Sequence, residues 1–185
     1  ASDVYKRQEV TKNNSTRRQT AYTYDDAGNI VSENRSGVDI DKKDELVRYY
    51  YDKANQLIRT NVEGKNTKYS YDLAGNLLSD GTNTYTYDLQ NRLTSKTGKD
   101  GTTTYTYDAA GNLLTETSPL GSVTTYTHDK EGNVLTQVDE NGKQTAYTYD
   151  KLYRMVSRKD ADGTATFAYD KAGNMTSAKD GNGTV

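Results

Sequence analysis

The chain has 185 residues, a mean hydropathy of −1.02, and a formal net charge of −2 from 24 basic and 26 acidic side chains. The charges are mixed and form no basic stripe, which disfavours nucleic-acid binding, and no apolar run approaches the ~18 residues of a membrane-spanning helix. With no cysteine and one histidine, disulfides are excluded and a zinc site is essentially excluded.

The amino-terminal residues are set aside before the fold is predicted. Residues 2–8, Ser-Asp-Val-Tyr-Lys-Arg-Gln, resemble the translation of a transposase mosaic-end sequencing adapter. We therefore interpret residues 1–8 as an adapter artefact and residues 9–20 as a partial leading strand or linker. Residues 21–185 are interpreted as eight repeats truncated at the carboxyl end, which indicates a fragment of a longer bacterial protein from metagenomic sequence.

Each repeat is anchored by two aromatic residues, two positions apart, followed at once by aspartate. The eight aspartates are spaced by 27, 20, 16, 20, 21, 21 and 20 residues, and the anchors hold 14 of the 17 tyrosines. Gly-Asn follows in five copies, and Asn55-Gln56, Asn91-Arg92 and Tyr153-Arg154 replace it in the others. The anchor residues, with their glycines, are Tyr22, Tyr24, Asp25 and Gly28; Tyr49, Tyr51 and Asp52; Tyr69, Tyr71, Asp72 and Gly75; Tyr85, Tyr87 and Asp88; Tyr105, Tyr107, Asp108 and Gly111; Tyr126, His128, Asp129 and Gly132; Tyr147, Tyr149 and Asp150; and Phe167, Tyr169, Asp170 and Gly173.

The first two anchors are separated by the long segment "SGVDIDKKDELVR", which we expect to protrude as a loop. Its carboxylates, Asp39, Asp41, Asp44 and Glu45, could bind calcium, but the glycine and terminal glutamate of an EF-hand loop are out of register. Two lysines also oppose a cation, so we favour a solvated loop. Further along, the 16-residue spacing shortens a hairpin at "SDGTNTY".

The regular copies, such as "TTTYTYDAAGNLLTET" at residues 102–117, predict two strands and a turn. The Thr/Tyr segment alternates with period two, which places both rings on one face of a strand. The aspartate is expected to accept backbone N–H groups in a type I turn, which a left-handed glycine closes as a bulge. Asp-Gly and Asn-Gly pairs then predict a second tight turn after a return strand of roughly six residues. No segment has a 3.6-residue period, so the fold class is all-β, a meander of antiparallel hairpins in a curved ribbon or spiral.

The segments "YTYDAAGNLL", "YSYDLAGNLL" and "YAYDKAGNMT" resemble the YD repeat, or RHS repeat, of bacterial Rhs proteins, toxin-complex C components, wall-associated proteins and teneurins. The resemblance covers roughly residues 20–185. It implies a β-shell that encapsulates and delivers a C-terminal toxin for competition or virulence, and a secreted or cell-surface location. The family's Asp-Pro-x-Gly core segment with its self-cleaving aspartate is not visible here. The implied partners are the downstream shell and the toxin cargo.

The alternative function is a wall-associated module whose tyrosines bind glycans or neighbouring cells. We favour packing for the tyrosines, because their rings are apolar enough to pack and their hydroxyls tolerate solvent. The eight aspartates are interpreted as turn caps, since an active site needs one converging group of different residues. His128 is interpreted as a substituted ring. We therefore expect no catalytic residue, no metal site, no cofactor and no enzymatic activity.

Overall fold

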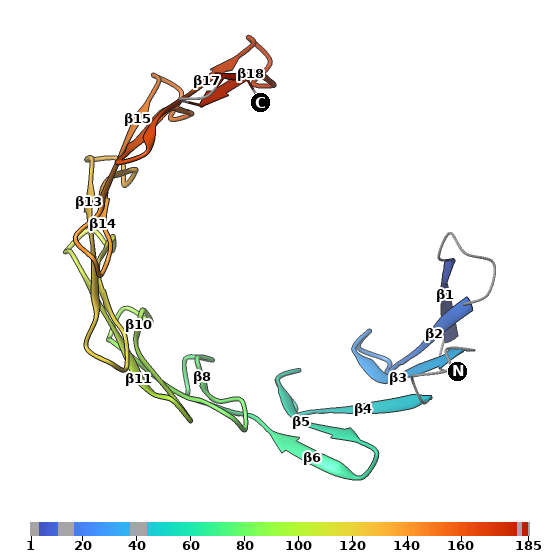
Figure 1. The fold of residues 1–185 in the computed structure, drawn as a ribbon. Helices are drawn as coiled ribbons and strands as arrows, with labels where there is room; N and C mark the ends of the chain where they lie inside the picture. Colours follow the sequence, from blue (N-terminus) through green and yellow to red (C-terminus); the bar gives the residue numbers. More distant parts are fainter. Residues whose placement is uncertain (1–3, 11–16, 38–43, 181–182, 185) are drawn as a thin grey trace. The chain divides into compact units, whose positions relative to one another are not determined.

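A computed structural model describes residues 4–10, 17–37, 44–180 and 183–184, and these residues form strands and turns without a helix (Figure 1). In this described part, no helix is long and apolar enough to cross a membrane. The all-β fold and the antiparallel hairpin meander predicted from the sequence are thereby confirmed. The strands are β1 (Val4–Val10), β2 (Arg17–Tyr24), β3 (Ile30–Gly37), β4 (Glu45–Tyr51), β5 (Leu57–Val62), β6 (Lys65–Lys68), β7 (Ser70–Tyr71), β8 (Leu77–Ser79), β9 (Thr84–Tyr87), β10 (Leu93–Gly98), β11 (Gly101–Tyr107), β12 (Leu113–Thr117), β13 (Val123–His128), β14 (Val134–Val138), β15 (Gln144–Tyr149), β16 (Met155–Asp160), β17 (Gly163–Tyr169), β18 (Met175–Asp180) and β19 (Gly183–Thr184).

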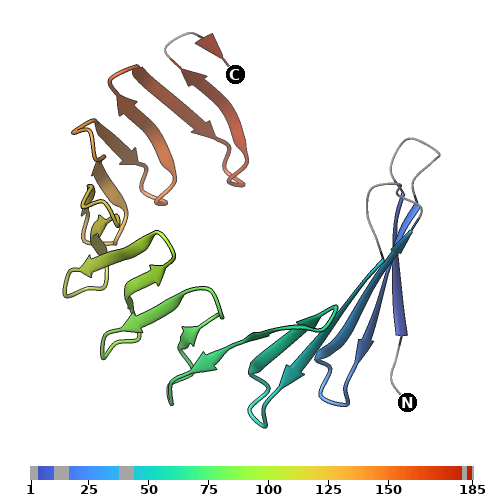
Figure 2. The ribbon, with the colours of Figure 1, turned by 60° about the horizontal axis from the view of Figure 1, so that its bottom comes forward.

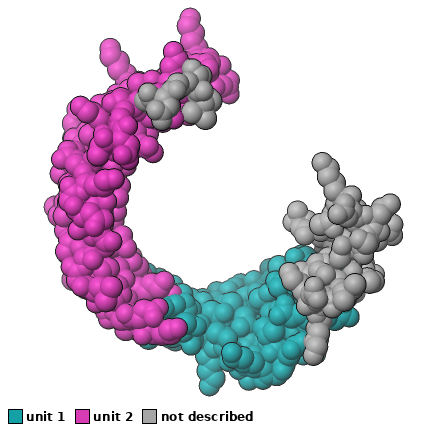
Figure 3. Space-filling model, viewed as in Figure 1, with its two compact units in different colours: residues 1–84 teal, residues 85–185 magenta. Residues whose placement is uncertain are grey.

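The chain forms two compact units, residues 1–84 and residues 85–185 (Figure 3). In the first unit, β1 to β6 are hydrogen-bonded neighbours in chain order, and the short strands β7 and β8 follow. In the second unit, β10 to β19 likewise lie side by side in chain order (Figure 2). Every described strand pair is antiparallel, as a meander with tight turns requires.

The register shifts by one residue in seven of the hairpins that contain a YD turn, the turn that begins at the anchor aspartate. Tyr107, for example, faces Leu113, while the preceding residue faces Thr115. The predicted glycine bulge explains this shift, because a bulge opposes two residues to one. The glycines of the five Gly-Asn turns have the positive φ predicted for them: Gly28 at 85°, Gly75 at 90°, Gly111 at 98°, Gly132 at 88° and Gly173 at 91°.

Two segments differ from the regular pattern. The strand expected around the third anchor is divided at Tyr69 into β6, which pairs with β5, and β7, which pairs with β8. In the shortened third repeat, β8 has three residues instead of about six, because the next turn already begins at Asp80. The solvated loop expected between the first two anchors falls largely on residues 38–43, so Asp39 and Asp41 lie outside the described residues.

Residues 4–10 form β1, which pairs with β2 from Val4↔Thr23 to Val10↔Arg17. This pairing describes backbone geometry and does not bear on where these residues come from. The assignment of residues 1–8 to an adapter, of 9–20 to a leading strand or linker, and of 21–185 to eight repeats therefore stays a prediction.

The described strands form two sheets, β1–β6 and β7–β19, and each sheet is one layer thick with almost no interior. Among the described side chains only Val47 and Glu33 are buried, with exposed fractions of 8% and 7%. In β11 the tyrosine positions are half-buried, and the threonines that flank Tyr105 are exposed, which agrees with rings on one face. Because no second layer covers either sheet in the described part of the chain, contacts between neighbouring strands must supply most of the stability.

Candidate functional site

The YD turn is held by the anchor aspartate. In the first copy the carboxylate oxygen Oδ1 of Asp25 accepts the backbone N–H groups of Ala27 at 3.0 Å and Asn29 at 2.8 Å. The backbone closes the same turn, since Gly28 N–H donates to Asp25 C=O at 3.0 Å and Asp25 N–H donates to Asn29 C=O at 3.0 Å. The other seven copies repeat the backbone pair. The aspartates thus satisfy turn N–H groups that the strands leave unpaired.

The residue four positions after the aspartate completes the cap. In the five Gly-Asn copies the asparagine side-chain amide donates to Oδ2 of the aspartate. In two other copies a guanidinium takes this role, because Arg92 Nε donates to Asp88 Oδ2 at 2.6 Å and Arg154 Nε donates to Asp150 Oδ2 at 2.7 Å. In these seven copies both carboxylate oxygens therefore accept hydrogen bonds inside their own turn.

These hydrogen bonds favour the ionised carboxylate. The asparagine side chain lowers the pKa of Asp25, Asp72, Asp108, Asp129 and Asp170. The pKa of Asp150 is lowered first by the Arg154 side chain, and that of Asp88 first by the backbone N–H of Arg92. A carboxyl with a lowered pKa is a poor general acid or base near neutral pH, which fits a structural role.

The second tyrosine of the anchor connects one repeat to the preceding one. Its phenol hydroxyl donates to the backbone carbonyl of the apolar residue that follows the preceding YD turn. The hydrogen bonds run from Tyr51 to Ile30 at 2.9 Å, Tyr71 to Leu57 at 3.0 Å, Tyr107 to Leu93 at 2.8 Å, Tyr149 to Val134 at 3.0 Å, and Tyr169 to Met155 at 2.9 Å. Burial raises the pKa of the Tyr51, Tyr71, Tyr107 and Tyr149 hydroxyls. These residues form what we call the tyrosine ladder.

The first aromatic residue of the anchor has a more varied environment. Tyr49 hydroxyl donates to the buried Glu33 at 3.0 Å, and burial followed by this carboxylate raises the pKa of Tyr49 to about 12. Arg35 Nε also donates to Glu33 at 2.6 Å and lowers the pKa of that carboxyl, while its Nη1 donates to Glu45 at 3.0 Å. Tyr105 and Tyr126 are half-buried, and burial raises the pKa of each.

Sequence reasoning did not find the role of the two arginines. Arg92 Nη1 donates to the backbone carbonyl of Asp108 in the next repeat at 2.9 Å, and its guanidinium lies 4.9 Å from the centre of the Tyr107 ring. Arg154 makes the same contacts with Asp170, at 3.1 Å, and with Tyr169, at 4.7 Å. We call each such residue an arginine clamp, because it holds its own turn and the next repeat together. The available signal was that both arginines stand where five copies have asparagine.

Three copies have no glycine at the left-handed position of the YD turn. Asn55 and Asn91 adopt φ of 60° and 61°, and Tyr153 adopts 59°. Asparagine tolerates this region, whereas a residue such as tyrosine is strained there. The turn geometry is therefore strong enough to impose an unfavourable backbone conformation at Tyr153.

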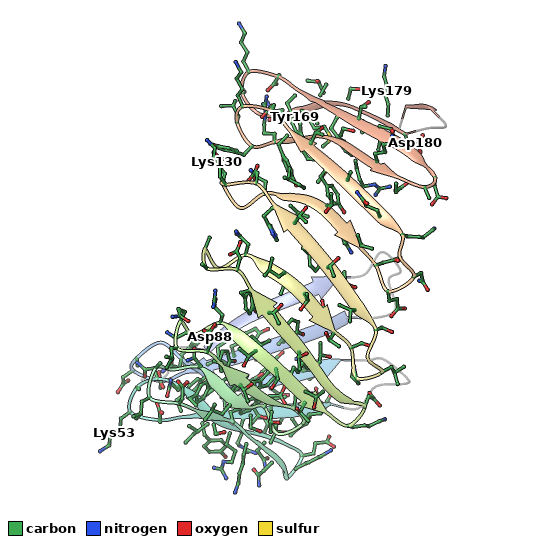
Figure 4. The ribbon with its side chains drawn as sticks, turned by 90° about the vertical axis from the view of Figure 1, so that its left-hand side faces the viewer. Lys53, Asp88, Lys130, Tyr169, Lys179 and Asp180 are labelled. Carbon is green, nitrogen blue, oxygen red and sulfur yellow. The ribbon has the colours of Figure 1, made fainter. Side chains whose placement is uncertain are left out.

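The predicted anchors are brought together in rows along the ribbon and not into one constellation. Figure 4 shows Asp88 and Lys130 at the edge of the second unit where the YD turns lie, with Lys179 and Asp180 toward the other edge. Within the described ranges, no group of three or more His, Asp or Glu side chains is arranged to hold a metal ion. The repeated geometry is that of a stacked structural unit.

Comparisons with known proteins agree with this geometry. A family model described as teneurin YD-shell matches residues 3–172. The fold is similar to that in the crystal structure of TcdB2-TccC3 without its hypervariable C-terminal region, at 17% identity and a TM-score of 0.59, over 92% of this chain and 11% of that one. It is also similar to that in TcdB2-TccC3-Cdc42, at 17% identity and a TM-score of 0.62, over 88% of this chain and 12% of that one. A search of curated protein sequences found no significant match.

The present chain spans about a tenth of the length of the solved chains that it matches. Its hairpin meander, its capped turns and a family match over residues 3–172 all describe a structural segment of a YD shell. This chain belongs to the teneurin YD-shell family.

Proposed function

We propose that this chain is a length of wall in a secreted bacterial Rhs-like shell, which encloses a C-terminal toxin and delivers it to other cells. The chain supplies no chemistry of its own. Its contribution is steric. A wall of paired strands separates the enclosed toxin from the surroundings and needs no specific contacts with that toxin. The partners of the wall are the remaining shell and the toxin.

The tyrosine ladder is the observation that carries this proposal. Each rung uses a side-chain donor from one repeat and a backbone acceptor from the preceding repeat, as with Tyr107 and Leu93 at 2.8 Å. A repeat with a tyrosine at this position supplies both groups, so the ribbon can be lengthened without a special terminal partner. A matched solved protein is described with a hypervariable C-terminal region, which supports a variable cargo behind a constant wall.

The test of this function is the coding sequence on both sides of the present chain. More YD repeats followed by an Asp-Pro-x-Gly core segment and an unrelated tail are expected. The complete protein should then protect its tail from a protease, and guanidinium treatment that unfolds the shell should expose it. A cell-wall anchor in place of the core segment, or a tail cleaved as fast with the shell intact as with it unfolded, would refute the proposal.

No observation favours the glycan-binding alternative as a second proposal. The second tyrosines of five anchors already donate their hydroxyls to backbone carbonyls. Their rings are half-buried along the strands. Both properties reduce what these tyrosines could offer to a sugar.

A further inference from the structure

The connections between successive repeats are unequal. We call the contact between the return strand of one repeat and the anchor strand of the next a joint, and we name it after the second aromatic residue of the later repeat. Six of the joints lie inside one or other of the two units. We compare the side-chain hydrogen bonds of the four joints in the second unit, those of Tyr107, His128, Tyr149 and Tyr169.

The Tyr107 and Tyr169 joints are the most strongly connected in the second unit. Each has a tyrosine hydroxyl that donates to a carbonyl of the preceding repeat, at 2.8 Å and 2.9 Å. Each also has an arginine clamp that returns a hydrogen bond in the opposite direction, at 2.9 Å from Arg92 and 3.1 Å from Arg154. Four residue pairs join the strands of each joint.

The Tyr149 joint is intermediate. Tyr149 donates to Val134 C=O at 3.0 Å, and Tyr147 donates to Gln137 Oε1 at 3.4 Å. The residue at the clamp position is Asn133, whose side-chain amide donates within its own turn. The joint thus has the ladder rung without the clamp.

The His128 joint has neither connection. An imidazole has no hydroxyl, and in this structure His128 Nδ1 is buried without a hydrogen-bond partner. At the clamp position stands Asn112, which caps Asp108 in its own turn and lies against Gly132 of the next repeat without bonding to it. Among the described interactions, no side-chain hydrogen bond joins the two repeats on either side of this joint.

The connecting turn of the His128 joint is also weakly capped. It is closed by Ser118, whose hydroxyl accepts one backbone N–H, that of Ser122, at 3.1 Å. The corresponding turn of the Tyr149 joint is closed by Asp139, whose carboxylate accepts two N–H groups at 2.9 Å and 2.8 Å. The number of residue pairs does not separate these two joints, since three join β12 to β13 and three join β14 to β15. A neutral cap with one hydrogen bond stabilises a turn less than a carboxylate with two.

We propose that the His128 joint is a built-in opening point, at which the ribbon of the second unit separates first. In a stack of repeats, stability is a sum of terms between nearest neighbours, so the first opening occurs at the weakest joint. The separation divides β10–β12 from β13–β19 without unfolding the hairpins on either side. This inference concerns how the wall opens and does not depend on what the shell encloses.

Hydrogen exchange of the 185-residue chain, followed by mass spectrometry, tests this proposal. The amides that pair β12 with β13 are expected to exchange faster than those that pair β14 with β15 or β16 with β17. The variant His128→Tyr, which restores the ladder rung, should slow exchange at its own joint by about three- to tenfold, the worth of one hydrogen bond. Exchange at the Tyr169 joint should remain unchanged.

The reverse substitution provides the matched control. Tyr149→His removes the rung at the next joint and should raise exchange there, so that two opening points are seen where the wild-type chain has one. Equal exchange at the three joints in the wild-type chain would overturn the proposal. So would a His128→Tyr variant that folds, as judged by circular dichroism, and leaves exchange at its own joint unchanged.

Discussion

At the scale of the residue, two positions of the YD turn meet separate requirements, one on the backbone conformation and one on the side chain. The left-handed position requires a positive φ and little else, and the aspartate requires only the N–H groups ahead of it. Tyr153 adopts the positive φ at a cost, because it has a φ of 59° and, at 57% exposed, little packing to offset the strain. Gly173 occupies the same position at 91° without strain.

Replacing Tyr153 by asparagine should therefore stabilise the chain by about 1 kcal/mol, since a left-handed conformation costs most side chains ~1–2 kcal/mol. Asn55 and Asn91 already adopt this conformation. The matched control is Gly173→Ala, whose Cβ would meet nothing within 4 Å, so that only backbone strain is added. We expect it to destabilise the chain by about 1 kcal/mol. Urea unfolding measures the change in the free energy of unfolding for both variants. Changes of the same sign would contradict backbone strain at Tyr153.

The anchor aspartates predict that acid weakens the fold. In the folded state the pKa values lie below the ordinary value of 3.8 for Asp25, Asp72, Asp88, Asp108, Asp129, Asp150 and Asp170. The stabilisation they contribute is complete above that pH and is lost as the pH falls through the lowered folded-state pKa values. The urea midpoint should thus fall between pH 7 and pH 3. The variant Asp108→Asn should have a lower urea midpoint than the wild type at pH 7, and its midpoint should fall less between pH 7 and pH 3. A fall as large as that of the wild type would exclude the Asp108 carboxylate as a contributor to the pH dependence.

At the scale of the element, the hairpin was predictable and the joint was not. Alternation of Thr and Tyr predicted the strands, and Asp-x-x-Gly predicted the turn with its glycine bulge, because each signal lies within a few residues. The rung from Tyr107 to Leu93 and the clamp from Arg92 to Asp108 each cross 14 or 16 residues to another repeat. They depend on side-chain direction and on the spacing of neighbouring strands, which periodicity does not specify. The short strand β8 in the third repeat could be expected from the 16-residue spacing of the aspartates. The division of the anchor strand of this repeat at Tyr69 could not be expected from the sequence.

The arginine clamp predicts a specific loss of stability. Arg154→Gln keeps a side-chain amide near Asp150 and removes the reach to the Asp170 carbonyl and the Tyr169 ring. We expect a loss of about 1 kcal/mol in the free energy of unfolding. Arg158→Gln in β16, the strand that follows Arg154, is the control, because the Arg158 side chain is about half exposed and its ion pair with Asp160 should contribute under about 0.5 kcal/mol. Equal losses in the two variants would show that the clamp has no special role.

At the scale of the whole molecule, stability should follow the number of repeats in a unit. Among the described residues, each strand pairs only with its neighbours in sequence, and no interior layer connects distant repeats. A ribbon of this kind gains or loses one repeat and one joint at a time. Its length is thus set by the gene and not by closure of a core.

Deleting residues 130–150 removes one complete repeat, because it joins Asp129 to the residue that follows Asp150. The shortened chain should keep its circular dichroism per residue and should be less stable than the original chain. A chain in which residues 130–150 are duplicated should be more stable. Thermal unfolding at equal protein concentration compares the stability of the three chains. If the deletion variant were unfolded, the second unit would have to be a single cooperative body and the additive picture would fail.

The acceptor in every rung of the tyrosine ladder is a backbone carbonyl, which every residue possesses. A repeat can therefore be followed by any other repeat that brings a tyrosine, whatever its own side chains are. Genes that encode such ribbons are open to unequal crossing-over, since a copy lost, gained or exchanged in register leaves each new boundary competent to bond. The opening point at His128 then has a simple origin as well, because a single base change from a tyrosine codon to a histidine codon weakens one boundary and leaves the others intact.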